Sequence, residues 1–308
     1  MHSNEVASTG WDRVGVAVAG LGSMGLGMAA SLLRAGADVT GYDPDPNKRE
    51  DFAALGGKVA VSSVEASRGA TLVVSVVVDA GQTEALLFGD EGIATVMAED
   101  GVFISCATMA PDRARRMAAR LEATGRHYLD APVSGGARRA ADGSLTILAS
   151  GTEQAFARAA PALDAMSATL HRLGEAPGEA AAFKMVNQLL AGVHIAAASE
   201  AIAFAAREGL DLHRVYEVIT ASAGNSWMFE NRVPHILDGD YRPLSAVDIF
   251  VKDLGIVLDM GRASSFPAPL ASAALQLFIM TSAAGMGRDD DSSVARLYAR
   301  IAGLDLSL

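Results

Sequence analysis

The clearest pattern near the N-terminus is a run of small and branched apolar residues, VGVAVAG, which continues into GLGSMGLGMAASLLRAGADVTGYD. A strand that is apolar at successive positions is typical of a parallel sheet covered by helices on both faces. The next segment has apolar residues at helical spacing, at Met24, Met28 and Leu32, and Gly36 ends it. A second strand is expected at Asp38–Tyr42. The pattern therefore predicts a strand, a helix and a strand in succession.

The same alternation continues to about residue 173. Further strands are expected at Thr71–Val78, Val102–Cys106, His127–Asp130 and Leu145–Ser150, and helices at Gln82–Leu87, Asp112–Ala123 and Glu153–Met166. This order predicts an α/β fold with a doubly wound open sheet, whose ligand crevice lies beyond the carboxyl ends of the strands.

Beyond the segment GEAPGE the chain shows only helical patterns. Residues Gly178–Glu208 predict one helix of roughly 45 Å. It is apolar on nearly every side, which places it in a protein core, and His194 and Glu200 argue against a membrane span. We expect a disordered tail at 1–12, an α/β domain at 13–177 and an all-α domain at 178–308. The run Arg288–Asp291 is interpreted as a solvated loop before the last helix.

Charge and cysteine content exclude several classes of protein. The net charge of −11 disfavours nucleic acid and anionic membranes as partners, since both require clustered Lys and Arg. The single cysteine, Cys106, excludes an intrachain disulfide and fits a reducing compartment. The first residues, MHSNEVASTGWDR, contain no apolar signal segment, so a cytoplasmic protein is expected. No His, Asp or Glu cluster has metal-ligand spacing, and no metal site is expected.

The first chemical signal is Gly20-x-Gly22-x-x-Gly25, between the first strand and the first helix. Gly20 permits the tight turn, Gly22 lets a pyrophosphate approach the backbone, and Gly25 lets the helix pack on the strand. The N-terminus of the helix supplies oriented N–H donors and partial positive charge for the phosphates. This context predicts dinucleotide binding.

An acidic residue, Asp43, directly follows the second strand, where it can accept hydrogen bonds from the adenosine ribose hydroxyls. Its charge repels a 2′-phosphate, which favours NAD over NADP. Lys48 and Arg49 lie close enough in sequence to weaken that preference.

Two further stretches carry candidate chemistry. Ser134, Gly135 and Gly136 offer a hydroxyl and successive backbone N–H groups that can hold a small anion, although an ordinary glycine turn has the same sequence. Lys184 and Asn187 lie three residues apart, hence on one face of the long helix. A buried lysine is costly, so Lys184 is a candidate functional residue; the alternative is that it extends from the helix start to water.

Taken in order, GLGSMG, DAPVSGG, Lys184-x-x-Asn187 and Lys252-Asp253-Leu254 resemble the motifs of the β-hydroxyacid dehydrogenase family, whose members are similar to 3-hydroxyisobutyrate dehydrogenase. The resemblance extends from Val14 to about Leu304. It implies an N-terminal Rossmann domain for NAD and a C-terminal all-α domain for substrate binding and dimerisation, joined by a long helix. It also implies assembly as a homodimer or homotetramer.

The resemblance implies a role for each matching residue. Lys184 would be the general acid/base, and Asn187 would orient the substrate or the lysine. To accept a proton Lys184 must be neutral, and burial and the positive nicotinamide both disfavour its ammonium form. The substrate carboxylate would be held by Ser134, Gly135 and Gly136. The residues implied in cofactor binding are Gly20, Leu21, Gly22, Ser23, Met24, Gly25, Asp43, Val78, Thr108 and Lys252.

The stretches LLAGVHIAAASEAIAFAA and NSWMFENRVPHILDGDYRPLSAVDIFVKDLG are most similar to the members that act on L-threonate. This implies a small hydroxy acid substrate, with NAD-dependent oxidation of L-threonate to 2-oxo-tetronate. The alternatives are 3-hydroxyisobutyrate oxidation, tartronate semialdehyde reduction, and a non-catalytic NAD-binding scaffold, which would not need Lys184. Arg139 stands where most members have glycine, and it can alter substrate preference.

Overall fold

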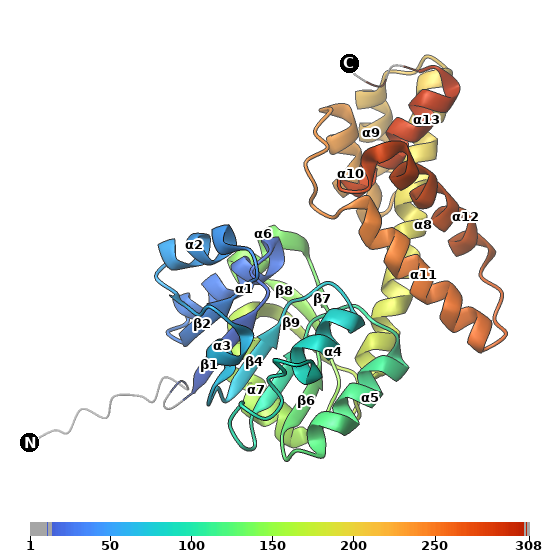
Figure 1. Ribbon diagram of the computed structural model, residues 1–308. Helices are drawn as coiled ribbons and strands as arrows, with labels where there is room; N and C mark the ends of the chain where they lie inside the picture. The colour runs from blue at the N-terminus through green and yellow to red at the C-terminus, as the bar shows by residue number, and fades with distance from the viewer. Residues whose placement is uncertain (1–10, 12–13, 305, 307–308) are drawn as a thin grey trace, which may run out of the picture. The chain divides into compact units, whose positions relative to one another are not determined.

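The computed structural model describes Trp11, residues 14–304 and Leu306, in two compact units, Met1–Lys184 and Met185–Leu308 (Figure 1). The tail predicted for residues 1–12 lies outside the described residues except for Trp11, which packs against the core of the first unit.

The first unit is built on a parallel sheet of six strands in the order β3-β2-β1-β4-β5-β6. The strands are β1 (Gly15–Ala19), β2 (Asp38–Tyr42), β3 (Lys58–Val59), β4 (Leu72–Ser75), β5 (Val102–Ser105) and β6 (His127–Asp130). Successive residues of β1 belong to two hydrophobic cores, one on each face of the sheet. Val16 and Val18 lie in one core and Ala17 lies in the other. Burial on both faces explains why the central strands β1, β4 and β5 have no polar positions in alternation.

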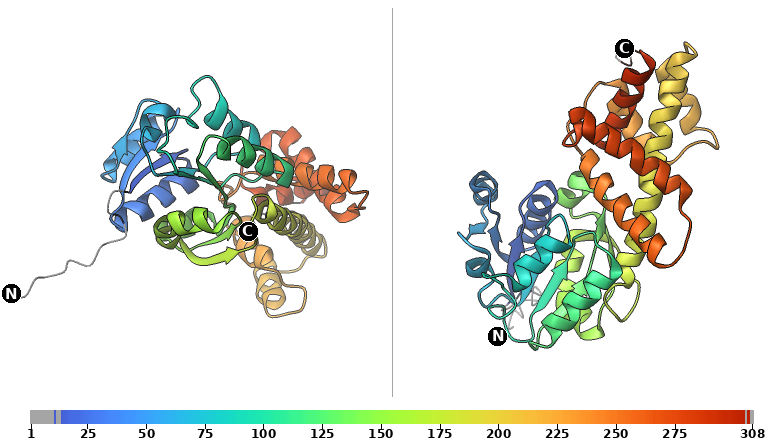
Figure 2. Two further views of the ribbon diagram at one scale, coloured as in Figure 1. Left: turned by 90° about the horizontal axis from the view of Figure 1, so that it is seen from below. Right: turned by 45° about the vertical axis from the view of Figure 1, so that its right-hand side comes forward.

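Helices cover both faces of this sheet (Figures 1 and 2). On one face lie α1 (Ser23–Arg34), α6 (Gly136–Asp142) and α7 (Glu153–Met166), and on the other α3 (Ser63–Ser67), α4 (Ala80–Phe88) and α5 (Pro111–Glu122). Helix α2 (Pro46–Ala54) contributes Phe52 to the core that contains α1. The doubly wound Rossmann-type sheet predicted from the sequence is confirmed.

One predicted strand belongs elsewhere. Leu145–Ala149 forms β8 of a separate three-stranded sheet, between β7 (Val133–Ser134) and β9 (Ser167–Arg172). It pairs antiparallel with β7 and parallel with β9. Its residues alternate between buried and half-buried, which suits a strand with only one face in the core. The expectation that it continues the main sheet was therefore wrong.

The second unit is all-helical, as expected. After the long helix α8 (Glu179–Arg207), it contains α9 (Leu212–Thr220), α10 (Trp227–Leu237), α11 (Val247–Ala263), α12 (Pro269–Thr281), a π-helical turn (Ser282–Met286), a 3-10 turn (Asp291–Ser293) and α13 (Val294–Ala302). Helices α8 and α11 run side by side in both figures. A Cβ added at Gly192 would lie 2.9 Å from a Leu254 side-chain carbon, so glycine permits this close approach.

Helix α8 is less buried than its composition predicts. Ile195 and Ile202 are fully buried, whereas Val186, Leu190 and Phe204 are 62%, 49% and 65% exposed. The helix therefore lies in the core along the side of Ile195 and Ile202, as expected, whereas one stripe of its apolar side chains faces away from the core of its own chain.

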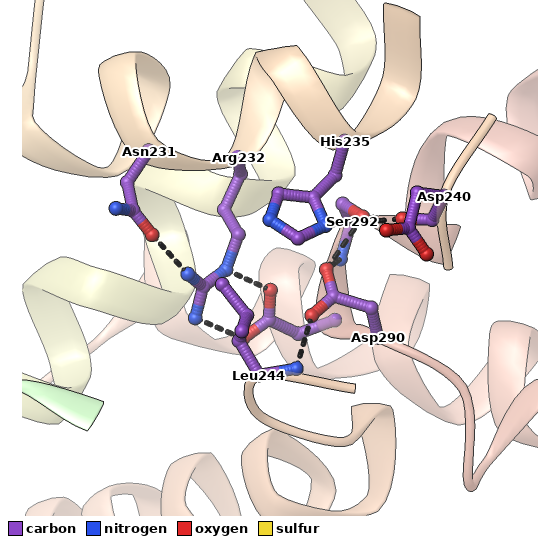
Figure 3. A network of polar contacts seen from close by, with 8 residues as sticks. Asn231, Arg232, His235, Asp240, Leu244, Asp290 and Ser292 are labelled. Carbon is purple, nitrogen blue, oxygen red and sulfur yellow. Dashed lines mark hydrogen bonds and ion pairs between the residues drawn. The ribbon is translucent and has the colours of Figure 1, made fainter. Parts of the chain in front are cut away.

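The prediction of a solvated loop at Arg288–Asp291 was wrong for its second half, because Asp290 and Asp291 are buried, whereas Arg288 is exposed and Asp289 half-buried. Asp291 accepts hydrogen bonds from Arg232 Nε at 2.5 Å and from a second guanidinium nitrogen at 3.0 Å. Asp290 accepts from the backbone N–H of Leu244 at 2.8 Å and from the Ser292 hydroxyl at 2.6 Å (Figure 3). Both carboxylates have no exposed surface and connect α10, the segment before α11 and the start of α13.

The start of α8 is held by a buried carboxylate from β6. Asp130 Oδ2 accepts hydrogen bonds from the backbone N–H groups of Gly178 and Ala181, both at 2.9 Å. The Ser150 hydroxyl accepts from Ala180 N at 3.0 Å. The first N–H groups of a helix have no acceptor within the helix, so Asp130 and Ser150 supply the missing acceptors. The negative charge of the carboxylate is also favourable at the N-terminus of a helix.

Asp130 makes the stability of the protein depend on pH. Burial raises the pKa of Asp130 to about 6, and the hydrogen bonds from Ala181 and Gly178 only partly offset that effect. The folded chain therefore binds this proton more tightly than the unfolded chain, so the free energy of unfolding rises as the pH falls from about 6 toward 4. This contribution is about 3 kcal/mol at most.

We predict that Asp130→Asn flattens this pH dependence, because it removes the charge but keeps a carbonyl oxygen for the helix N–H groups. Urea unfolding followed between about pH 4 and pH 7 measures the effect. The control is Asp90→Asn, at an exposed carboxylate of the same unit, which should keep the wild-type slope. An Asp130→Asn protein with the wild-type slope would contradict the assignment.

Candidate dinucleotide and substrate site

The glycine-rich turn between β1 and α1 is shaped by close backbone contacts. Gly20 has φ 96°, and a Cβ there would lie 2.5 Å from the Val76 carbonyl oxygen. A Cβ on Gly25 would lie 1.9 Å from the Gly20 carbonyl oxygen. Only glycine fits at either position. By contrast, a Cβ on Gly22 would meet nothing within 4 Å, so open space lies beside that residue.

This turn has the donors that a pyrophosphate needs. The first N–H groups of α1, from Ser23 onward, have no acceptor within the helix, and the first turn contains no acidic residue. Leu26 N is the first to bond within the helix, to Gly22 O at 2.8 Å. Open space at Gly22 and unused donors beside it fit the diphosphate of a dinucleotide.

Asp43 lies directly against the glycine turn. Its Oδ2 accepts a hydrogen bond from Leu21 N at 2.8 Å, and its Oδ1 accepts from Asp45 N at 2.9 Å. Each carboxylate oxygen has a second acceptor position. The guanidinium of Arg49 donates to the Asp43 backbone carbonyl at 2.5 Å, rather than to the carboxylate.

Val78 and Thr108 follow β4 and β5, at the carboxyl edge where the glycine turn also lies. The order β2-β1-β4-β5 makes these strand ends neighbours. The strand predicted to reach Val78 ends at Ser75, so Val78 lies in the loop, 49% exposed, with its N–H bonded to Gln82 Oε1 at 2.9 Å. A ligand at the β1–β4 boundary would lie at the switch point of the sheet.

The predicted anion cradle and the predicted catalytic lysine come together in the first unit. Lys184 Nζ donates to the Val133 carbonyl oxygen at 3.0 Å, and Ser134 is the next residue. Gly135 and Gly136 follow with φ 134° and 75°, conformations that favour glycine. Lys184 is only 7% exposed, so the alternative that it extends to water is wrong.

Asn187 and Lys252 are joined by residues to which the sequence interpretation gave no role. Asn187 donates to Gln188 Oε1 at 2.9 Å, and Gln188 donates to Asp253 Oδ2 at 2.5 Å. Lys252 Nζ lies 2.7 Å from Asp253 Oδ1. In the sequence, Asp253 follows Lys252 in the motif Lys252-Asp253-Leu254, and Gln188 follows Asn187. Their position next to a predicted site residue was the only signal in the sequence that could have identified them.

Two other features lie apart from this chemistry. Burial raises the pKa of the Cys106 thiol to about 12, so the thiol is unreactive near neutral pH. A cavity of about 730 Å³ in the helical unit is lined by His194, Phe204, Arg214, Val218 and Phe229, among others, and by none of the predicted site residues. Within the described residues, no group of three or more His, Cys, Asp or Glu side chains is placed to hold a metal ion.

Family models match both units. Residues 15–174 match the NAD binding domain of 6-phosphogluconate dehydrogenase, and residues 178–298 match the NAD-binding domain of NADP-dependent 3-hydroxyisobutyrate dehydrogenase.

Similar proteins extend over nearly the whole chain. L-Threonate dehydrogenase of Cupriavidus necator is 52% identical over 93% of this chain and 96% of its own, and the Escherichia coli K12 enzyme of that name is 46% identical over 93% and 95%. A crystal structure of 3-hydroxyisobutyrate dehydrogenase from Salmonella typhimurium has TM-score 0.88 and 47% identity, covering 92% of this chain and 99% of that one.

These matches show whether the two long apolar helices belong to a membrane or to the core of a soluble fold. Glu179–Arg207 and Pro269–Met286 are long and apolar enough to cross a membrane. The likeness to the Salmonella typhimurium structure identifies them as core helices of a soluble dehydrogenase fold. The resemblance inferred from the four motifs is confirmed: the chain belongs to the 3-hydroxyisobutyrate dehydrogenase family of NAD(P)-dependent hydroxyacid dehydrogenases.

Proposed function

We propose that this protein oxidises L-threonate to 2-oxo-tetronate with NAD. The observation that carries the proposal is the contact between Lys184 Nζ and the carbonyl of Val133, directly before Ser134. In a 2-hydroxy acid the carboxylate is bonded to the reacting carbon, so a carboxylate cradle and a proton acceptor must be neighbours. The identity of 46–52% to L-threonate dehydrogenases supports this substrate.

A second candidate substrate is 3-hydroxyisobutyrate. The solved structure with 47% identity bears the name 3-hydroxyisobutyrate dehydrogenase, and the Pseudomonas aeruginosa enzyme of that name is 33% identical. In that acid the reacting carbon is one bond further from the carboxylate. We prefer L-threonate, because the Cupriavidus necator enzyme named for it is 52% identical to this chain, against 33% for the Pseudomonas aeruginosa 3-hydroxyisobutyrate dehydrogenase.

In the proposed reaction Lys184 is the general base. A neutral amine can keep its N–H donation to the Val133 carbonyl and accept the hydroxyl proton with its lone pair. Bound NAD supplies the hydride acceptor. Ser134 and the backbone N–H groups of Gly135 and Gly136 hold the carboxylate, and Asn187 orients the substrate.

The proposed cofactor site consists of the glycine turn and the loops beside it. The backbone of Gly20–Gly25, with Leu21, Ser23 and Met24, holds the diphosphate. Asp43 accepts from the adenosine ribose hydroxyls and disfavours a 2′-phosphate, so we propose NAD rather than NADP. Val78, Thr108 and Lys252 complete the contacts.

This assignment divides the chain into a dinucleotide-binding domain at 13–177 and a substrate-binding and self-association domain at 178–308. We further propose a cytoplasmic enzyme, consistent with its single cysteine and its use of NAD.

We also propose that the chain assembles as a homodimer or homotetramer through the exposed stripe of α8. Val186, Leu190 and Phe204 are each about half exposed or more, and Phe204 borders the cavity between α8, α9 and α10. Large exposed apolar side chains along one side of a helix are typical of a contact between protein chains. A second copy of this chain would cover this apolar stripe, and no charged group is needed to bind it.

The function is tested by initial rates of NAD⁺ and NADP⁺ reduction with L-threonate, D-threonate, L- and D-erythronate, glycerate, serine and 3-hydroxyisobutyrate. We expect kcat/KM for L-threonate with NAD⁺ to exceed every other combination by at least about tenfold. A preference for 3-hydroxyisobutyrate would replace the substrate, and a preference for NADP⁺ would contradict the role of Asp43. No rate with any acid would favour the non-catalytic scaffold.

The assembly is tested with Phe204→Glu, because burying an unpaired carboxylate between two chains is costly. We expect the subunit dissociation constant to rise at least about a hundredfold, or about 2.7 kcal/mol, in sedimentation analysis. The control is Glu208→Gln, beyond the end of the same helix, which should keep the wild-type mass. A Phe204→Glu protein with the wild-type mass would show that another surface is used.

A further inference from the structure

Four polar side chains form a continuous chain between α8 and α11. It runs from Asn187 through Gln188 to Asp253 and Lys252, with contacts of 2.9, 2.5 and 2.7 Å. Gln188 is 7% exposed and Asp253 1% exposed. Lys252 and Asp253 form an ion pair at the end of this chain. Only Asn187, at one end, is exposed.

The carboxylate of Asp253 fixes the direction of every hydrogen bond in this chain. A carboxylate only accepts, so Gln188 must turn its amide nitrogen toward Asp253. The carbonyl of Gln188 then faces Asn187, and a carbonyl also only accepts. Asn187 must therefore donate Nδ2 to Gln188, which turns its Oδ1 to the opposite side. The two ends of an amide have nearly the same shape, so this chain of donors and acceptors determines which end faces outward.

We propose that Asp253 and Gln188 are positioning residues that fix Asn187 as a hydrogen-bond acceptor for a substrate hydroxyl. The proposal rests on the proposed oxidation of a hydroxy acid, and it adds the class of acid that the site selects. Asn187 lies one turn beyond Lys184 on the same face of α8, so a substrate bound at the lysine is within reach of Asn187.

The hydroxyl in question is not the one that reacts. The reacting O–H gives its only proton to Lys184, so it has none to donate to Asn187 Oδ1. A second hydroxyl must fill that place. L-Threonate has hydroxyls beside the reacting one, whereas 3-hydroxyisobutyrate has no second hydroxyl. The arrangement therefore selects polyhydroxylated acids, because an acid without the second donor leaves the oriented acceptor unpaired.

The test compares kcat/KM for L-threonate with that for the 2-hydroxybutyrate of the same configuration at carbon 2, which has the reacting hydroxyl alone. The variant Gln188→Met keeps the length of the side chain but removes both hydrogen bonds. We expect it to lose at least about tenfold in kcat/KM on L-threonate and less than about twofold on 2-hydroxybutyrate. A purely structural role would lower both rates alike.

A second experiment exchanges the amide of Gln188 and the carboxylate of Asp253. Gln188→Glu alone brings two carboxylates together, and Asp253→Asn alone removes the group that sets the direction. In the double variant the introduced glutamate accepts from Asn187 and from the introduced asparagine, so Asn187 keeps its orientation. We expect Asp253→Asn alone to lose the wild-type preference for L-threonate and the double variant to recover it to within about threefold.

The outcomes separate the two claims. Wild-type protein that is inactive on L-threonate and on the other acids overturns the proposed function. Active wild-type protein with equal losses on both substrates in Gln188→Met, or a double variant no better than Asp253→Asn, overturns the positioning role alone.

Discussion

The contact on which the site depends is the anchoring of the first turn of α8 by Asp130. Its carboxylate, from the end of β6, accepts the N–H groups of Gly178 and Ala181. Lys184 follows Ala181 by three residues, so it lies on the same face one turn later. The position of its amine against Val133 is therefore a consequence of where β6 ends. Burial makes this carboxylate costly to ionise, which is the energetic cost of fixing the helix at that point.

The parts of the fold that were predictable are those in which burial on both faces leaves an unbroken apolar run. Strands β1, β4 and β5 are of this kind, and α7 has the predicted bounds, Glu153–Met166. Strands β3 and β7 have two residues each, too few to show a period. Strand β9 is mostly exposed and has no apolar pattern, so its pairing with β8 comes from tertiary structure.

The candidate site likewise contains residues that could be predicted from the sequence and residues that could not. The glycine turn and Lys184 could be found because unusual residue types occupy positions with strict steric or electrostatic demands. Asp130 and the Val133 carbonyl could not, because their partners lie 48 to 51 residues away. The acidic run at Asp290 and Asp291 was misinterpreted for the same reason: Arg232, which makes burial of Asp291 possible, is 59 residues distant. A local charge pattern does not contain that information.

The most direct test of the central claim is chemical rescue of Lys184→Ala with small primary amines. We predict that the variant loses about a thousandfold in L-threonate oxidation and that methylamine or ethylamine restores the rate in proportion to its free base. Lys58→Ala, at an exposed lysine paired with Asp38, should remain as active as wild type. A Lys184→Ala protein that oxidises L-threonate within about threefold of the wild-type rate without added amine would contradict the account.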